Sequence, residues 1–246
     1  MLQTLLIGGG KVERDGDRAR MILPPTPHRT YADAQLDDYH GLRRNRFPDS
    51  PPVRMTVRAR ASHPAPAGTL GFGFWNDPFS LSGGVLAAPN SVWFFYASPP
   101  SDMALAEGVP GWGWKAATLN SGRLHPLILA PGALAAMALT RIPGLGRPVM
   151  AAARRAVQAH EAMLADVPLT EWHTYELEWW DDMAVFRVDR VERLRSPAPP
   201  RGPLGFVAWL DNQYAIASRE GKFGFGLCEV KEEQWLEVEG LKVESG

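Results

Sequence analysis

The stretch Trp172-His-Thr-Tyr-Glu-Leu-Glu-Trp179 leads into a second apolar run, Val185-Phe-Arg-Val-Asp189. Both runs are rich in aromatic and β-branched residues, which favour strands, and Asp181-Asp182 between them suits a tight turn. Asp189-Arg190 can turn the chain again, into Val191 to Leu194. The stretch therefore predicts an antiparallel meander.

Segments of the same kind recur along the whole chain, separated by clusters of Gly, Pro, Asp and Asn. Val53 to Ala61 alternates between apolar residues and arginine or threonine, which is typical of a strand with one face exposed to water. The other predicted strands are Arg18 to Leu23, Tyr31 to Tyr39, Thr69 to Trp75, Val92 to Ala97, Lys115 to Leu119, Thr174 to Trp180, Ala184 to Val188, Leu204 to Leu210, Lys222 to Glu229 and Trp235 to Val243. The pattern predicts an all-β fold, a two-sheet antiparallel sandwich.

The pattern W-H-x-Y-x-x-x-W at residues 172–179, followed by F-x-V-D at residues 186–189, resembles a strand pair of family 16 glycoside hydrolases and related concanavalin A-like domains. The resemblance implies a jelly-roll sandwich of the lectin and glucanase type. It concerns the fold and carries no catalytic residue. Arg190 stands where the family usually has glycine, a departure that concerns only the turn.

The family's catalytic strand carries E-x-D-x-x-E or E-x-D-x-E, and its two glutamates serve as nucleophile and general acid in retaining hydrolysis. This sequence contains neither motif. The aromatic strand at the comparable place, Asn90 to Ser98, has no carboxylate. No catalytic residue is therefore carried over from the family, and its hydrolytic mechanism is not expected.

The composition is that of an ordinary globular protein: 45% of the 246 residues are hydrophobic and 22% are charged. Sandwiches of this length form single domains, so we expect one domain over residues 1–246. The 26 Lys and Arg residues balance 27 Asp and Glu residues, for a net charge of -1. This balance argues against a nucleic-acid partner.

The sequence also gives no indication of a disulfide-stabilised, secreted, membrane-spanning, or metal- or cofactor-binding protein. Cys228 is the single cysteine, so no intramolecular disulfide can form. The apolar stretch within Met1 to Lys11 is too short for a secretory signal, and we expect a cytoplasmic protein. Leu124 to Thr140 is apolar but broken by His125, two prolines and a glycine, so no membrane span is predicted. The six histidines lack metal-ligand spacing and no glycine loop suits a phosphate, so neither a metal nor a cofactor is predicted.

One region, Pro131 to Ala165, departs from the strand pattern because it is rich in Ala, Leu and Met. Ile142 to Pro148 divides it into two predicted helices, the second at about Val149 to Leu164. We expect a helical hairpin inserted between strands. It can cap the sandwich, close over a ligand cleft or form a homo-oligomer contact.

Aromatic residues beside polar ones mark the first candidate ligand contacts. Trp75 and Asn76 lie in the segment Gly71 to Pro78, at a predicted strand end, where Trp75 can stack on a sugar or another flat ligand and Asn76 can hydrogen-bond it. Trp93 and Phe95 share one face of their strand, and alternation leaves open whether that face meets a cleft or the core. For each of these residues, core packing is the alternative.

Lys115 follows Trp114 in a second aromatic cluster, Gly111-Trp-Gly-Trp-Lys115. A lysine beside tryptophan rings can flank an anionic or aromatic ligand, and loop packing is the alternative.

Polar residues also end two apolar strands, and alternation places them on shared faces: Trp209, Asp211 and Gln213 on one strand, and Gln35 and Asp37 on the other. If both sets line one concave sheet, Asp37 and Asp211 become candidate carboxylates for acid–base chemistry. His125, at the entry to the predicted helices, is a further candidate for proton transfer. Surface turns and hydrogen-bonded strand ends are the alternative reading.

These features support three hypotheses. The first is a sandwich that holds a carbohydrate in a Trp-lined concave cleft. The second is an intracellular enzyme or carrier for an apolar small molecule, in a pocket covered by the helical insert. The third is a structural or assembly protein that uses the insert as its interface.

Overall fold

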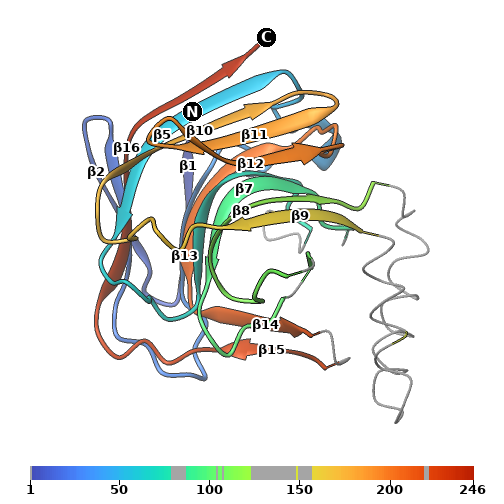
Figure 1. The fold of residues 1–246 in the computed structure, drawn as a ribbon. Helices are drawn as coiled ribbons and strands as arrows, with labels where there is room; N and C mark the ends of the chain where they lie inside the picture. Colours follow the sequence, from blue (N-terminus) through green and yellow to red (C-terminus); the bar gives the residue numbers. More distant parts are fainter. Residues whose placement is uncertain are drawn as a thin grey trace.

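The computed structural model describes residues 2–78, 87–103, 105–106, 108–122, 148, 157–218 and 222–246. In these residues the chain forms two seven-stranded antiparallel sheets packed face to face (Figure 1). Sheet A contains, in spatial order, β1 (Gln3–Ile7), β4 (Asp33–Asp37), β13 (Gly205–Asp211), β6 (Thr69–Trp75), β7 (Ser91–Ala97), β8 (Gly113–Asn120) and β9 (Gln158–Met163). Sheet B contains β12 (Val191–Pro197), β11 (Met183–Val188), β10 (His173–Trp179), β5 (Val53–Ala61), β16 (Gln234–Ser245), β3 (Arg18–Leu23) and β2 (Lys11–Asp15). The prediction of an all-β antiparallel sandwich is confirmed.

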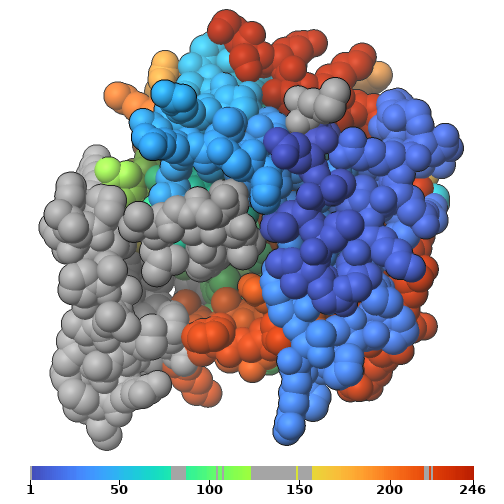
Figure 2. Space-filling view, turned by 180° about the vertical axis from the view of Figure 1, so that it is seen from behind, coloured from blue at the N-terminus to red at the C-terminus, as the bar shows by residue number. Residues whose placement is uncertain are grey.

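Two smaller elements complete the described chain. β14 (Gln213–Ala217) and β15 (Phe223–Leu227) form a separate antiparallel pair at one end of sheet A, and η1 (Arg44–Arg46) is a short 3-10 helix. Sheet A is curved, and its face turned away from sheet B is concave (Figure 1). We call this surface the concave face. Seen from the opposite side, the molecule has a hollow bounded by the blue N-terminal segments and the orange segment near β14, with green strands at its floor (Figure 2).

The meander predicted at residues 172–189 is present. β10 pairs antiparallel with β11, with Tyr175 opposite Val188. Asp189 and Arg190 turn the chain with positive φ angles of 50° and 69°. The Asp189 carboxylate accepts a hydrogen bond from the Thr174 N–H (2.9 Å) and contacts His173 Nδ1 (2.6 Å). These contacts hold the turn where a glycine would otherwise be favoured.

The core lies between the sheets and is built by residues that alternation points inward. Phe94 of sheet A contacts Tyr175 and Phe186 of sheet B, with ring centroids 4.9 and 5.3 Å apart. Phe74 lies 5.6 Å from Trp179, whose indole N–H donates to the Pro200 carbonyl oxygen (2.8 Å). Burying each of these aromatic side chains contributes roughly 2–3 kcal/mol. This packing fixes which face of sheet A meets the core.

The predicted helical hairpin is wrong where the structure describes it. Gln158–Met163, predicted to end the second helix, forms β9 and pairs with β8, with Asn120 opposite Gln158 and Lys115 opposite Met163. Pairing satisfies the backbone N–H and C=O groups along the edge of β8, and this outweighs the helix propensity of the segment. Residues 131–147 and 149–156 of the predicted hairpin lie outside the described residues. Among the residues that are described, no helix is long and apolar enough to cross a membrane.

Candidate functional site

The register of sheet A decides which side chains share the concave face. One row runs across the sheet from Gln35 on β4 through Trp209, Gly71 and Phe95 to Lys115 on β8. The neighbouring rows bring Trp93 and Trp75 to the same face, since residues two apart on a strand point the same way. The structure thus resolves the orientation of β7, with Trp93 and Phe95 on the concave face and Phe94 in the core.

Four aromatic residues, Trp75, Trp93, Phe95 and Trp209, form what we call the aromatic platform. Trp93 and Phe95 stack with centroids 5.3 Å apart and planes 15° apart, and Trp93 lies 5.1 Å from Trp209. Trp75 is parallel to Trp209 within 5°. Trp75 and Trp209 are each 8% exposed, whereas Trp93 and Phe95 are only half-buried and form the accessible part of the platform.

Glycine on β6 makes room for these rings. A Cβ at Gly71 would lie 2.7 Å from the Trp209 ring, and a Cβ at Gly73 would lie 2.7 Å from Trp93 Cβ. Gly73 also has a φ of 147°, a conformation that other residues rarely adopt. The glycines noticed in the sequence therefore admit aromatic side chains of neighbouring strands to the concave face.

A hydrogen-bonded network supports one edge of the platform. Gln35 Nε2 donates to Asp37 Oδ2 (2.8 Å) and to the Tyr39 hydroxyl (3.2 Å), and that hydroxyl accepts from Trp75 Nε1 (2.5 Å). Asp37 is fully buried, and its Oδ1 accepts from the backbone N–H groups of Tyr39 (3.2 Å) and His40 (2.7 Å). Gln35 and Asp37 thus lie beside the platform, but their hydrogen bonds go to the protein and hold Trp75.

A pair of carboxyl groups lies at the end of the platform. Asp211 on β13 is directly opposite Asp33 on β4. Asp211 Oδ1 accepts from Thr69 Oγ1 (2.7 Å), which in turn accepts from Trp209 Nε1 (2.9 Å). Asp33 is 1% exposed, and its Oδ2 has no hydrogen-bond partner in the described part of the chain. Asp211 is therefore connected to the platform through Thr69.

Burial governs the titration of this pair. It raises the pKa of Asp211 to about 6. Burial, reinforced by the charge of Asp211, raises the pKa of Asp33 well above its usual range. Two carboxyls on opposite residues of a buried strand pair oppose each other's ionisation, which acts in the same direction as burial. Asp33 was not singled out from the sequence, although its position two residues before Gln35 places it on the same face.

The other edge of the platform holds a buried ion pair. Lys115 Nζ donates to Glu161 Oε1 on β9 at 3.3 Å, and the two side chains are 1% and 6% exposed. Burial lowers the pKa of Lys115, and the charge of Glu161 opposes that shift. Trp114, predicted as a ligand contact together with Lys115, instead points into the core, 5.7 Å from Tyr175.

Three other predicted site residues lie away from the concave face or outside the described chain. The Asn76 side chain donates to the Ala88 carbonyl oxygen (2.7 Å) and accepts from the Asn90 N–H (2.9 Å), so it holds a loop. Gln213 begins the separate strand β14 because the chain leaves sheet A at Asp211, and alternation does not carry it onto the concave face. His125 lies outside the described residues.

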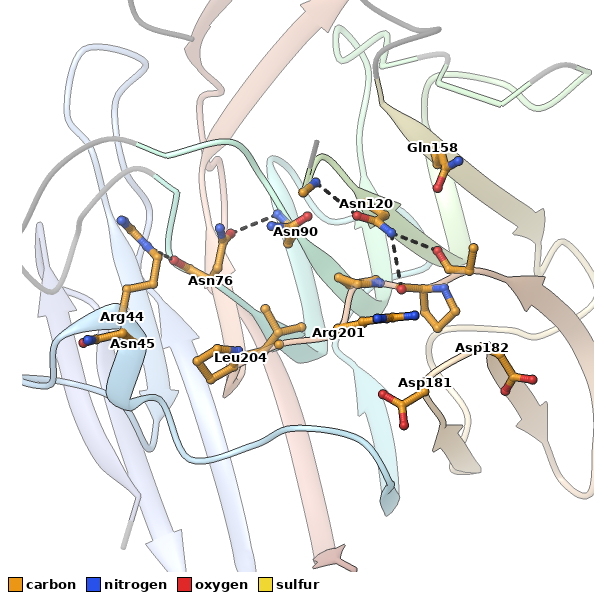
Figure 3. Close-up of a pocket in the computed structure, with 16 residues that line it drawn as sticks. Arg44, Asn45, Asn76, Asn90, Asn120, Gln158, Asp181, Asp182, Arg201 and Leu204 are labelled. Carbon is orange, nitrogen blue, oxygen red and sulfur yellow. Dashed lines mark hydrogen bonds between the residues drawn. The ribbon is translucent and has the colours of Figure 1, made fainter. Parts of the chain in front are cut away.

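A second hollow, distinct from the concave face, lies at one end of the sandwich (Figure 3). We call it the end pocket. Its volume is about 810 Å³, within the range of ligand pockets. It is lined by residues of η1, of the loops that follow β6 and precede β7, of the facing ends of β8 and β9, of the β10–β11 turn, and of the segment 198–204 that crosses from sheet B to sheet A. Within the described residues, no group of three or more His, Cys, Asp or Glu side chains could hold a metal.

The fold defines a concanavalin A-like sandwich of the kind found in family 16 glycoside hydrolases, which confirms the resemblance at the level of architecture. A family 16 endo-glucanase from Bacteroides ovatus matches with a TM-score of 0.52 and 12% identity, over 99% of this chain and 94% of that one. A structure reported under human gut microbiota endo-acting O-glycanases matches with a TM-score of 0.50 and 12% identity, over 94% and 81%.

The chain spans 54% of the length of another similar structure, an endo-β-galactosidase from Clostridium perfringens (TM-score 0.48, 11% identity, 95% of this chain covered). It spans 17% of the length of a sialidase chain (TM-score 0.46, 8% identity, 99% of this chain covered). At the level of sequence, no family model and no curated protein matches.

Proposed function

We propose that this protein binds a carbohydrate on the concave face of sheet A, with sugar rings packed on the aromatic platform. The observation that carries the proposal is the stacked, half-buried pair Trp93 and Phe95 on a base of buried tryptophan. Aromatic faces offer large, rigid apolar area, which suits the apolar faces of sugar rings. The structural similarity to an endo-glucanase supports the same class of ligand.

The side chains of β7 on the concave face suit carbohydrate binding without hydrolysis. Its side chains there belong to Ser91, Trp93, Phe95 and Ala97, so this strand presents no pair of carboxylates about 5 Å apart, as retaining hydrolysis requires. Asp33 and Asp211 are both buried and lie on other strands. We therefore propose a binding function for the platform.

The test compares Trp93→Ala with the wild-type protein in titrations with a mixed-linkage β-glucan tetrasaccharide. Loss of a central aromatic contact weakens affinity by about tenfold or more. Trp172→Ala is the matched control, since Trp172 packs against Arg60 on the outer face of sheet B, 4.7 Å from its guanidinium. Equal affinity of the Trp93→Ala and wild-type proteins, or no binding by the wild type, would contradict the proposal.

A second candidate function is favoured by one observation, the low exposure of Trp75 and Trp209, 8% each. Aromatic walls with so little open surface also suit a flat apolar molecule. A thermal-shift screen separates the two candidates, because a ligand at 100 times its Kd stabilises the fold by about 2.7 kcal/mol. Stabilisation by apolar compounds and not by sugars would favour this second function.

A further inference from the structure

The end pocket has a rigid frame built by asparagine side chains. Asn90 Oδ1 accepts from the Ser121 N–H (2.7 Å), and the Asn90 N–H donates to Asn76 Oδ1 (2.9 Å). Asn120 Nδ2 donates to the carbonyl oxygens of Ala198 (3.0 Å) and Pro199 (3.3 Å). These bonds tie the loops around β6, β7 and β8 to the segment that enters β13. The pocket wall is therefore formed before any ligand arrives.

Arg44 adds to this frame from η1. Its guanidinium donates to the backbone carbonyl oxygens of Asn76 (2.6 Å) and Asp77 (2.7 Å). The side chains of Arg44, Asn76, Asn90 and Asn120 therefore form hydrogen bonds with the protein itself.

Five other polar side chains of the pocket are different, because none makes a hydrogen bond or ion pair in the described part of the chain: Asn45, Gln158, Asp181, Asp182 and Arg201. They come from separate elements, η1, β9, the β10–β11 turn and the segment before β13. Figure 3 shows Arg201 extending into the pocket between the asparagine wall and the Asp181-Asp182 turn. Four of these residues are exposed and Gln158 is half-buried, and together they line the hollow from four separate elements.

The apolar part of the pocket lies beside these groups. Pro199, Pro200 and Leu204 are buried lining residues of the crossing segment. The pocket thus combines an apolar wall with amide, carboxylate and guanidinium groups, which together can accept and donate hydrogen bonds.

We propose that the end pocket is a second, separate binding site for a short, uncharged, hydroxyl-rich ligand, a mono- or disaccharide, held by Arg201, the Asp181-Asp182 turn and Gln158. The presence of both carboxylates and a guanidinium in the pocket favours an uncharged, hydroxyl-rich ligand over a charged one. A lone anion would meet Asp181 and Asp182, and a lone cation would meet Arg201, whereas sugar hydroxyls donate to carboxylates and accept from the guanidinium. The proposal does not depend on the aromatic platform, which lies on a different face.

The experiment is a two-dimensional NMR titration of the full chain with laminaribiose and, separately, cellobiose. Trp93 Nε1–H reports the platform and Arg201 Nε–H reports the end pocket. In the wild type both signals should shift, each with its own Kd. Asp181→Asn should weaken the response of Arg201 about tenfold while leaving the Kd at Trp93 unchanged.

Arg201→Ala provides the complementary variant and Arg29→Ala the control, since both arginines are exposed and the change in charge is equal. Arg201→Ala should reduce the number of disaccharides bound from two to one, whereas Arg29→Ala should leave two. Circular dichroism and the melting temperature check that each variant is folded.

The outcomes separate this proposal from the proposed function. Shifts confined to Trp93 overturn the end-pocket site and leave the platform. Shifts confined to Arg201 support the end pocket and count against the platform. One binding event weakened equally by Trp93→Ala and Arg201→Ala indicates a single extended site and overturns the separate one, and no response to either disaccharide overturns both.

Discussion

At the scale of single residues, Asp211 links proton binding to the aromatic platform. Its Oδ1 accepts from Thr69 Oγ1 and from the Gln213 N–H (3.1 Å), and Thr69 holds the Trp209 indole. An asparagine oxygen can accept both bonds without carrying charge. The charge of Asp211 can therefore be removed while its hydrogen-bonding role is kept.

We predict that Asp211→Asn flattens the pH dependence of stability. The folded-state pKa of Asp211, about 6, is raised above the ordinary 3.8, so the folded protein binds the proton more tightly than the unfolded chain. The free energy of unfolding therefore falls as the pH rises through that window, by on the order of 1–3 kcal/mol for this group. Urea unfolding at pH 4, 6 and 8 measures the free energy of unfolding of both proteins. If Asp211→Asn loses stability with rising pH as steeply as the wild type, the pH dependence does not come from Asp211.

A second residue-scale prediction concerns Gly71. Its added Cβ would lie 2.7 Å from the Trp209 ring and would also meet the Phe94 carbonyl oxygen. Gly71→Ala should destabilise the fold by about 1–3 kcal/mol and change the tryptophan fluorescence. Gly224→Ala is the control, since its nearest neighbour would be Ile216 at 3.9 Å. Equal melting temperatures for the two variants would show that Gly71 is not needed to seat Trp209.

At the scale of elements, β9 contributes both backbone pairing and an ion pair to sheet A. Lys115 on β8 and Glu161 on β9 are buried together, and Glu161 Oε2 also accepts from the Ala106 N–H (3.1 Å). Removing one partner of such a pair leaves the other charge buried without compensation.

We therefore predict that Lys115→Met destabilises the protein by about 3–5 kcal/mol. Adding Glu161→Gln should recover most of this loss, because it removes the uncompensated charge and an amide oxygen can still accept from the Ala106 N–H. Denaturant unfolding of the two single variants and the double variant forms the cycle. Additive losses would show that the two charges are not coupled.

At the scale of the whole molecule, the two sheets and the β14–β15 pair differ in how they are anchored. Central strands such as β5 and β10 contribute fully buried side chains to the core, including Met55 and Trp179. β14 and β15 form a separate two-stranded sheet, with Phe225 79% exposed. A pair of strands with little buried apolar area is marginally stable by itself.

Hydrogen exchange should therefore protect β5 and β10 most and β14–β15 least. Mass spectrometry of peptides from residues 173–188 and 213–218 provides the comparison, and similar protection of the two would contradict this account of the molecule. A ligand on the concave face would add protection to β7, whereas a ligand in the end pocket would add it to segment 198–204.

The sequence by itself determined the antiparallel sandwich, the meander from Trp172 to Asp189 and most of the strands, although β1, β2, β9 and β14 were not predicted. Period-two alternation, aromatic content and turn residues are local properties, and they act within a few neighbouring positions. The same alternation predicted that Trp209 shares a strand face with Asp211, and that Gln35 shares one with Asp37.

Only the tertiary structure decided how these strand faces are used. Alternation gives β7 two aromatic faces, and contact with sheet B decides that Phe94 is in the core and Trp93 on the concave face. Pairing with β8 turns a helix-prone segment into β9, and the register of β4 against β13 sets Asp33 opposite Asp211. These outcomes depend on residues far apart in the chain, because burial and backbone pairing are satisfied by partners that local sequence does not specify.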